Sequence, residues 1–309
     1  MGRWSSLLLS SQYVLDDEVE IVSADSREFA IHYTTYRENI FFRQSWERRV
    51  SIFGDATSCY WISLNHRRIG GVCLEPNSLS SFFLIPPFID VFRVMLPLKK
   101  FLISCSRPNQ PIQAYGILPY QTEHFLRLGF LPSESRRVMI RPTESFEQQE
   151  WGDELDCVAP SAKRVDEVAK MLLESYSGTD SIGYPAENTI QQQISALEYY
   201  FKNNDIEILK SASSLIYNKS NNELIAVCFI SLWEDLPLVS NIAVIPKYRS
   251  KQIATRLLKK ALTVLKDEYE VLRLFVTIGN PAESLYYRLG FYPGLEQTTF
   301  YLPHETRRY

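Results

Sequence analysis

A short basic turn between a predicted strand and a predicted helix is the part of the sequence best suited to hold a charged ligand. The apolar run of residues 242–245 stops at Pro246, and Arg249 and Lys251 follow. Apolar residues then recur at helical spacing, at positions 253, 254, 257, 258, 261, 262 and 265. The amides and the positive dipole end of such a helix attract phosphate groups, and the two cations can add charged contacts. We therefore expect a phosphate or pyrophosphate site at this turn.

The turn resembles the coenzyme-A-binding motif of the GCN5-related N-acetyltransferase (GNAT) superfamily. That motif reads Arg/Gln-x-x-Gly-x-Gly/Ala and opens the long helix after the fourth strand. Arg249 and Ala254 match it, whereas Gln252 stands at the position of the usual central glycine. We expect ordinary helical or bridging dihedrals at Gln252, with its side chain directed away from the phosphates. The resemblance implies acetyl-CoA as cosubstrate, held by Ile242, Ala243, Val244, Arg249, Ser250, Lys251, Gln252, Ile253, Ala254 and Thr255.

A second block, residues 271–291, reads as a strand, a break at residues 279–281, a short helix and a stop at Gly290. It resembles the other half of the same signature, Asn-x-x-Ala-x-x-Leu-Tyr-x-x-x-Gly-Phe, with one residue fewer between the Asn and the Ala. In that family the Asn side chain contacts the pantetheine arm and the Tyr hydroxyl protonates the departing CoA thiolate. The resemblance carries these roles to Asn280 and Tyr286.

Acetyl transfer to an amine also needs a polarised thioester carbonyl and a base. The resemblance assigns the first task to the backbone around residues 242–244. The sequence leaves the base open. Ser240 or Asn241 could hold a water that takes the proton, and Glu234 or Asp235 could accept it, although a solvated turn is the plainer interpretation of these two acids.

The first half of the sequence repeats the second. Three segments recur at an offset of 160 or 161 residues: 84–88 as 244–248, 98–102 as 258–262, and 125–130 as 286–291. We therefore predict two GNAT folds in tandem, each an α/β domain with a mixed sheet, with domain boundaries at 1–147 and 148–309.

The two copies differ where chemistry would occur. In the N-terminal copy the leading Arg of the turn is replaced by Ile89, and Asp90 would repel a pyrophosphate. Pro97 falls inside the following helix, and Phe125 stands at the position of Tyr286. We expect the N-terminal domain neither to bind nor to turn over acetyl-CoA, although a diverged site that still works is the alternative.

Hydrophobic periodicity places the elements around these motifs. In the N-terminal half it predicts a helix over 34–49, a hairpin of strands 60–64 and 69–74, and a strand over 81–85. In the C-terminal half the predicted elements are a strand over 155–159, helices over 165–176 and 189–202, a hairpin of strands 214–217 and 224–232, a strand over 238–245, and a helix over 251–267. The loop of residues 176–185 either borders an acceptor pocket or is only a long connection.

Composition narrows the function classes. A net charge of −3 and a pI of about 5.9 argue against a nucleic-acid partner. No apolar run approaches the ~20 residues of a membrane span, so we expect no membrane partner. Five cysteines without a Cys-x-x-Cys pair suggest a reduced cytoplasmic chain, and the four histidines show no metal-ligand spacing.

These observations predict a cytoplasmic, acetyl-CoA-dependent N-acetyltransferase that is active in its C-terminal domain. The acceptor would be a small-molecule or peptide amine, and formation of a homodimer is left open. Two alternatives remain. One is an aminoacyl- or peptidyl-type transferase on the same paired fold, for which the acidic chain lacks a basic track for tRNA. The other is a non-catalytic acyl-CoA sensor or scaffold, which Gln252 and the lack of a carboxylate in the strand before the turn support.

Overall fold

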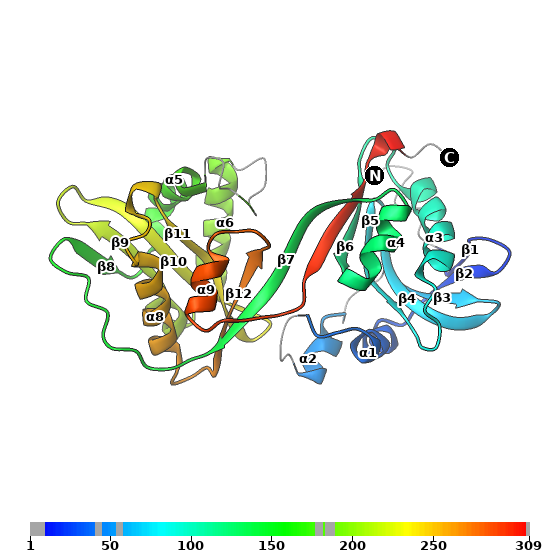
Figure 1. The fold of residues 1–309 in the computed structure, drawn as a ribbon, viewed down its shortest axis with the longest axis horizontal. Helices are drawn as coiled ribbons and strands as arrows, with labels where there is room; N and C mark the ends of the chain where they lie inside the picture. Colours follow the sequence, from blue (N-terminus) through cyan, green and yellow to red (C-terminus); the bar gives the residue numbers. More distant parts are fainter. Residues whose placement is uncertain (1–9, 41–44, 54–57, 177–181, 183–188, 307–309) are drawn as a thin grey trace. The chain divides into compact units, whose positions relative to one another are not determined.

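The computed structural model describes residues 10–40, 45–53, 58–176, 182 and 189–306, and its chain divides into two compact units (Figure 1). Unit 1 comprises Met1–Arg136 with Leu295–Tyr309, and unit 2 comprises Arg137–Gly294. The units are therefore not the contiguous halves 1–147 and 148–309 that the sequence predicts, because the C-terminal strand returns to unit 1.

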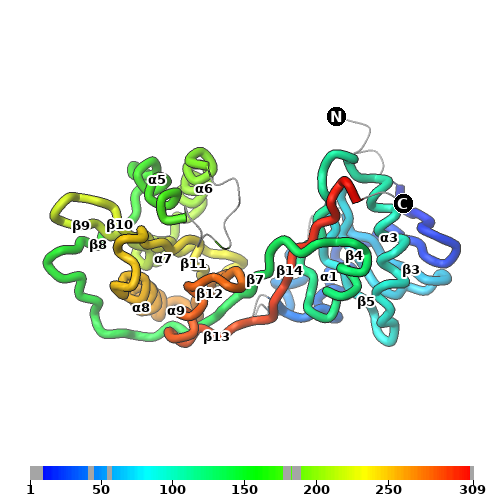
Figure 2. The backbone as a smooth tube through the Cα atoms, turned by 45° about the horizontal axis from the view of Figure 1, so that its top comes forward, coloured from blue at the N-terminus to red at the C-terminus, as the bar shows by residue number. Residues whose placement is uncertain are grey.

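The returning strand is β14 (Gln297–Leu302), which pairs with β6 (Ile112–Ile117) and with the first half of β7 (Leu131–Pro142) in unit 1 (Figure 2). Its alternate residues Phe300 and Leu302 are almost fully buried in the main core of unit 1. Burial of this apolar face explains why the end of the chain joins the first unit.

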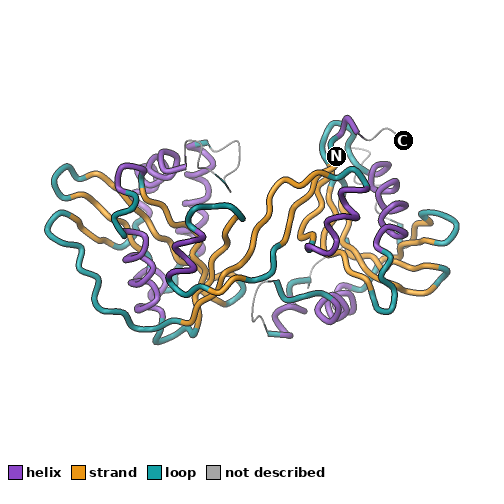
Figure 3. The backbone as a smooth tube through the Cα atoms, viewed as in Figure 1, coloured by secondary structure: helices purple, strands orange, loops and turns teal. Residues whose placement is uncertain are grey.

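In unit 1 the strand order is β1-β2-β3-β4-β5-β6-β14-β7. The other strands are β1 (Gln12–Val14), β2 (Val19–Ser23), β3 (Cys59–Leu64), β4 (Arg67–Glu75) and β5 (Ser78–Leu84). The helices are α1 (Ser26–Tyr36), α2 (Trp46–Ser51), α3 (Val91–Cys105) and α4 (Thr122–Arg127). Side chains of α3 and α4 pack in one core cluster and those of α1 in another, so helices cover both faces of the sheet (Figure 3).

The predicted helix over 34–49 is wrong. The structure instead has α1, capped by the Asp25 carboxylate on the amide of Glu28, and the separate helix α2 after its N-cap Ser45. Helix α1 ends because Arg37 has extended dihedrals (φ −114°, ψ 139°). The predicted hairpin is confirmed as β3 and β4.

In unit 2 the second half of β7 is followed by the strand order β12-β11-β10-β9-β8, and β13 (Tyr292–Pro293) pairs with β7. The strands are β8 (Leu155–Val158), β9 (Ser214–Asn218), β10 (Glu223–Trp233), β11 (Leu236–Val244) and β12 (Val271–Thr277). The helices are α5 (Val165–Tyr176), α6 (Ile190–Asn203), α7 (Glu207–Ala212), α8 (Ile253–Leu265) and α9 (Glu283–Arg288). The predicted helices, hairpin and strand over 238–245 are confirmed within a few residues, and α7 was not predicted.

The internal repeat is visible in the strand registers of the two units. In unit 1 β5 and β6 are parallel and pair at Ser78 with Gln113 and at Leu79 with Ala114. In unit 2 β11 and β12 are parallel and pair at the positions 160 residues later, Leu238 with Arg273 and Val239 with Leu274. Equal registers at a constant offset mean that the same fold is built twice.

Candidate functional site

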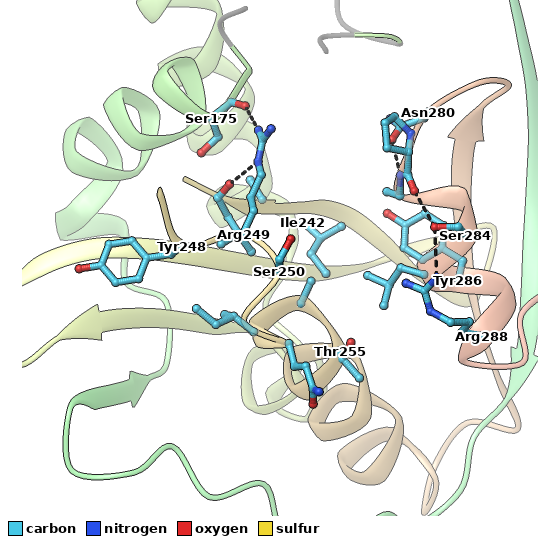
Figure 4. Close-up of a pocket in the computed structure, with 18 of the residues that line it drawn as sticks. Ser175, Ile242, Tyr248, Arg249, Ser250, Thr255, Asn280, Ser284, Tyr286 and Arg288 are labelled. Atoms are coloured by element: carbon cyan, nitrogen blue, oxygen red, sulfur yellow. Dashed lines mark hydrogen bonds between the residues drawn. The ribbon is translucent and has the colours of Figure 1, made fainter. Parts of the chain in front are cut away.

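A cavity of about 640 Å³ lies in unit 2 at the end of β11, beyond the point where β11 stops pairing with β12 (Figure 4). Its walls come from β11, from the first turn of α8 and from the segment that leads into α9. The lining residues are Ser175, Tyr176, Ile242, Ala243, Val244, Tyr248, Arg249, Ser250, Gln252, Ile253, Ala254, Thr255, Asn280, Pro281, Ala282, Ser284, Leu285, Tyr286 and Arg288. The two sequence motifs thus meet at one cavity, as the resemblance implies.

The N-terminus of α8 opens on this cavity. Its first backbone N–H groups, at residues 253–255, have no acceptor within the helix. The N-cap residue Gln252 makes no side-chain capping hydrogen bond. Uncapped amides at the positive end of a helix of 13 residues form a site for an anion.

Gln252 corrects one expectation. Its dihedrals are φ 60° and ψ 12°, in the left-handed region, and not the ordinary helical or bridging ones that we expected of a glutamine. Ser250 is also left-handed, with φ 61°. The turn therefore keeps the backbone path that a glycine would give it, at a strain cost of about 1–2 kcal/mol for a residue with a Cβ.

The two cations of the turn have partners within unit 2. The Arg249 guanidinium donates to the carbonyl oxygens of Val244, at 3.2 Å, and of Ser175, at 2.7 Å (Figure 4). It therefore ties the C-terminal end of α5 to the end of β11. Lys251 is not among the described lining residues, and its ammonium lies 4.9 Å from the ring centroid of Tyr248. A direct contact of either residue with phosphate stays a prediction.

Helix α9 places Tyr286 in the cavity wall with only 6% of its surface exposed. Its ring packs edge-on against Phe291, with 6.0 Å between centroids. The Asn280 amide bridges two segments, because Oδ1 accepts from the amide of Ala282 at 2.9 Å and Nδ2 donates to the carbonyl of Ile182 at 3.2 Å. Both residues of the second motif therefore line the cavity where the sequence predicts them.

The two base candidates Glu234 and Ser240 are not brought to the cavity. Glu234 lies in the tight turn between β10 and β11, eight positions before Ile242, which corresponds to roughly 25 Å of strand. Ser240 occupies a bulge of β11 and donates to the carbonyl of Phe229 at 3.2 Å. Among the described residues that line the cavity, none is acidic.

Several lining residues were not predicted. Arg288 and Ser284 are one helical turn apart on α9, with 3.5 Å between Nη1 and Oγ, so helical spacing from Tyr286 could have indicated them. Tyr176 donates a hydrogen bond to Oδ1 of Asn241 on β11. No local signal predicts that pair, because its residues are 65 positions apart. The other residues of the predicted acceptor loop, except Ile182, lie outside the described residues.

Comparisons with known proteins agree with this geometry. Residues 168–291 match the model of the Acetyltransferase (GNAT) family. A solved GCN5-related N-acetyltransferase from Sphaerobacter thermophilus is similar in fold, with 13% identity, a TM-score of 0.67, and coverage of 93% of this chain and 96% of that chain. No curated protein matches the sequence.

Two further solved structures are similar. One is a tandem GNAT protein from the clavulanic acid biosynthesis pathway, with 10% identity, a TM-score of 0.58, and coverage of 93% of this chain and 99% of that chain. The other is a GCN5-related glucosamine N-acetyltransferase region of a fungal multi-domain GH3 β-N-acetylglucosaminidase, with 10% identity and a TM-score of 0.59. The match covers 92% of this chain and 38% of that chain.

Residues 168–291 are therefore a GNAT domain, and the chain has the fold of two GNAT domains in tandem. This fold supports acyl transfer in general. Within the described residues, no helix is long and apolar enough to cross a bilayer.

Proposed function

We propose that this protein is an acetyl-CoA-dependent N-acetyltransferase with its active site in unit 2. The observation that carries the proposal is the single cavity in which the uncapped N-terminus of α8, the end of β11 and the buried Tyr286 meet. The acceptor is a primary amine of a small molecule or a peptide. We place the activity in the cytoplasm, in keeping with five free cysteines.

The cavity fits the chemical groups of CoA. The amides of residues 253–255 suit the pyrophosphate, and Arg249 and Arg288 add positive charge beside them. Beyond Val239 the edge of β11 that faces β12 has no registered partner among the described strands, while β10 pairs with the opposite edge. Backbone groups of residues 240–244 on that free edge can bond the amides of a pantetheine chain, as an added strand would.

Acetyl-CoA supplies an activated thioester, and the residues of this chain act around it. Backbone N–H groups near residues 242–244 hold the acyl carbonyl and stabilise the negative charge that grows on its oxygen. The Tyr286 hydroxyl donates a proton to the sulfur as it leaves. With no acidic residue in the described lining, we assign removal of the amine proton to a water held by Asn241, whose side chain Tyr176 fixes.

The same lack of an acid in the described lining favours a second candidate, a non-catalytic acyl-CoA sensor. The two functions separate in one experiment. The full chain is incubated with acetyl-CoA and a panel of primary amines, and release of the free CoA thiol is followed. We expect at least one amine to raise release above the rate without amine. Tight binding of acetyl-CoA with no amine-dependent release would favour the sensor, and no binding at all would contradict both.

A further inference from the structure

Unit 1 contains a buried arginine at the place where its sheet would open. Arg37 follows α1 directly and is only 5% exposed. Nη1 donates to the carbonyl of Phe82 on β5 at 2.7 Å, and Nη2 donates to the carbonyl of Gly116 on β6. One guanidinium therefore spans the gap between two parallel strands whose own pairing ends at Leu79.

The bridged gap corresponds to the cavity of unit 2. Phe82 lies 160 positions before Ile242, which lines that cavity, and the strand registers show the same offset. In unit 2 the edge of β11 beyond Val239 faces open space. In unit 1 the equivalent edge of β5 is occupied by the Arg37 side chain.

Gly116 is fitted to this arginine. Its φ of +70° is a left-handed value, and a Cβ added there would lie 3.6 Å from Nη2 of Arg37. A larger residue would strain the strand and crowd the guanidinium. The approach of Arg37 to β6 is therefore built into the backbone.

The anion position at the helix N-terminus is also taken in unit 1. Helix α3 corresponds to α8, and its N-cap Asp90 lies 160 positions before Ser250. The Asp90 carboxylate accepts a hydrogen bond from the amide of Arg93 at 3.0 Å. Helix α8 has no such side-chain cap. A carboxylate thus lies where a phosphate would have to bind.

We propose that unit 1 fills its own counterpart of the cofactor cleft with Arg37 and Asp90, so that this unit takes no acyl-CoA and serves as a permanently closed structural copy. Arg37 replaces the strand-bonding arm of the ligand, and Asp90 replaces its anion. The inference rests on the proposed assignment of the unit 2 cavity to acyl-CoA. Its strand-bridging part can be tested without that assignment.

Hydrogen–deuterium exchange of the full chain, with and without CoA, tests the proposal. We expect CoA to slow exchange in residues 242–244 and 253–255 and to leave 82–84 and 91–94 unchanged. Arg37→Ala should speed exchange in 82–84 and 114–117 by roughly tenfold or more, because charge-assisted hydrogen bonds between the strands are lost. Arg67→Ala, at an exposed position of β4, is the matched control and should change neither segment.

The outcomes separate the two claims. Slower exchange of 82–84 in the presence of CoA would overturn the proposal, and so would an Arg37→Ala chain that exchanges like the wild type. If Arg37→Ala fails to fold, the comparison of wild type with and without CoA decides alone. No protection in either unit would contradict the assignment of the unit 2 cavity, while the Arg37 comparison would still report on the closed gap.

Discussion

Gln252 adopts a backbone conformation that few non-glycine residues adopt, with φ 60°. We expect Gln252→Gly to stay within about 1 kcal/mol of the wild type in unfolding free energy, because relief of strain offsets the extra chain entropy of glycine. Gln252→Val should lose more than about 1 kcal/mol, since β-branched residues strongly disfavour φ above zero. Urea unfolding measures both values. If valine and glycine are equally stable, the left-handed conformation is wrong.

Tyr286 and Tyr287 form a matched pair for testing proton donation. Tyr286 is buried in the cavity wall, whereas Tyr287 is 46% exposed and its hydroxyl accepts from Arg137 at 3.4 Å. We expect Tyr286→Phe to lower turnover by about 10²–10⁴-fold with CoA affinity nearly unchanged, because only the proton donor is lost. Tyr287→Phe should leave the rate alone. Equal effects of the two substitutions would require a different catalytic acid.

Sequence motifs predicted the residues of the site that act locally and failed for those that depend on distant contacts. Asn280 and Tyr286 line the cavity because one short segment fixes their spacing. Glu234 was a base candidate because of its type, but the length of β11 carries it away from the cavity. Arg37 gave no signal, because its two carbonyl acceptors lie 45 and 79 positions further along the chain.

At the scale of elements, helix α6 rests on the sheet of unit 2 partly through Tyr200. The Tyr200 hydroxyl donates to the carbonyl of Ile230 at 3.2 Å, and burial raises its pKa to about 12. The folded chain therefore keeps this proton above pH 10, where the unfolded chain loses it. Stability from this group is complete below pH 10 and falls by about 1.4 kcal/mol per pH unit between pH 10 and 12.

Tyr200→Phe removes this titration. The unfolding free energy of the wild type should thus fall more steeply than that of Tyr200→Phe as pH rises from 9 to 11, measured by urea unfolding at each pH. Parallel curves would mean that the hydroxyl is not buried as described.

Strands β3 and β4 bring two thiols together in unit 1. Cys59 and Cys73 are direct partners in the register, with 3.5 Å between their sulfur atoms. The hydrogen bond from the amide of Leu74 to the carbonyl of Ser58 marks them as a non-hydrogen-bonded pair, in which side chains lie closest. The bond between the thiols lowers the pKa of Cys59, while it and burial raise the pKa of Cys73.

We therefore expect diamide to oxidise this pair to an intramolecular disulfide, a spacing that cross-strand geometry allows. Peptide mapping by mass spectrometry should show the linked peptides. Cys59→Ser should abolish the link, and Cys105→Ser should leave it intact. A link that involves other cysteines would contradict the register of β3 and β4.

Elements followed from sequence where their signals are local. The apolar periodicity of α5 and α8 needed no knowledge of the partner surfaces, and their bounds were predicted within a few residues. The helix over 34–49 was wrong because the N-cap at Asp25 and the break at Arg37 were overlooked. The position of β14 could not be predicted, since its partners lie more than 150 residues earlier and are selected by burial.

For the whole molecule, the account claims one cofactor site in a chain that carries two copies of one fold. The difference between the copies can be transplanted. Ser250 corresponds to Asp90, so Ser250→Asp places a carboxylate at the helix N-terminus of unit 2 as unit 1 has it. Ser250→Asn has the same shape without the charge and tolerates the left-handed backbone.

Isothermal titration of CoA into the wild type and these two variants is the most direct test of that claim. The account predicts one site per chain in the wild type, an affinity at least about tenfold weaker in Ser250→Asp, and wild-type affinity in Ser250→Asn. Two equivalent sites in the wild type, or Ser250→Asp binding as tightly as the wild type, would contradict it.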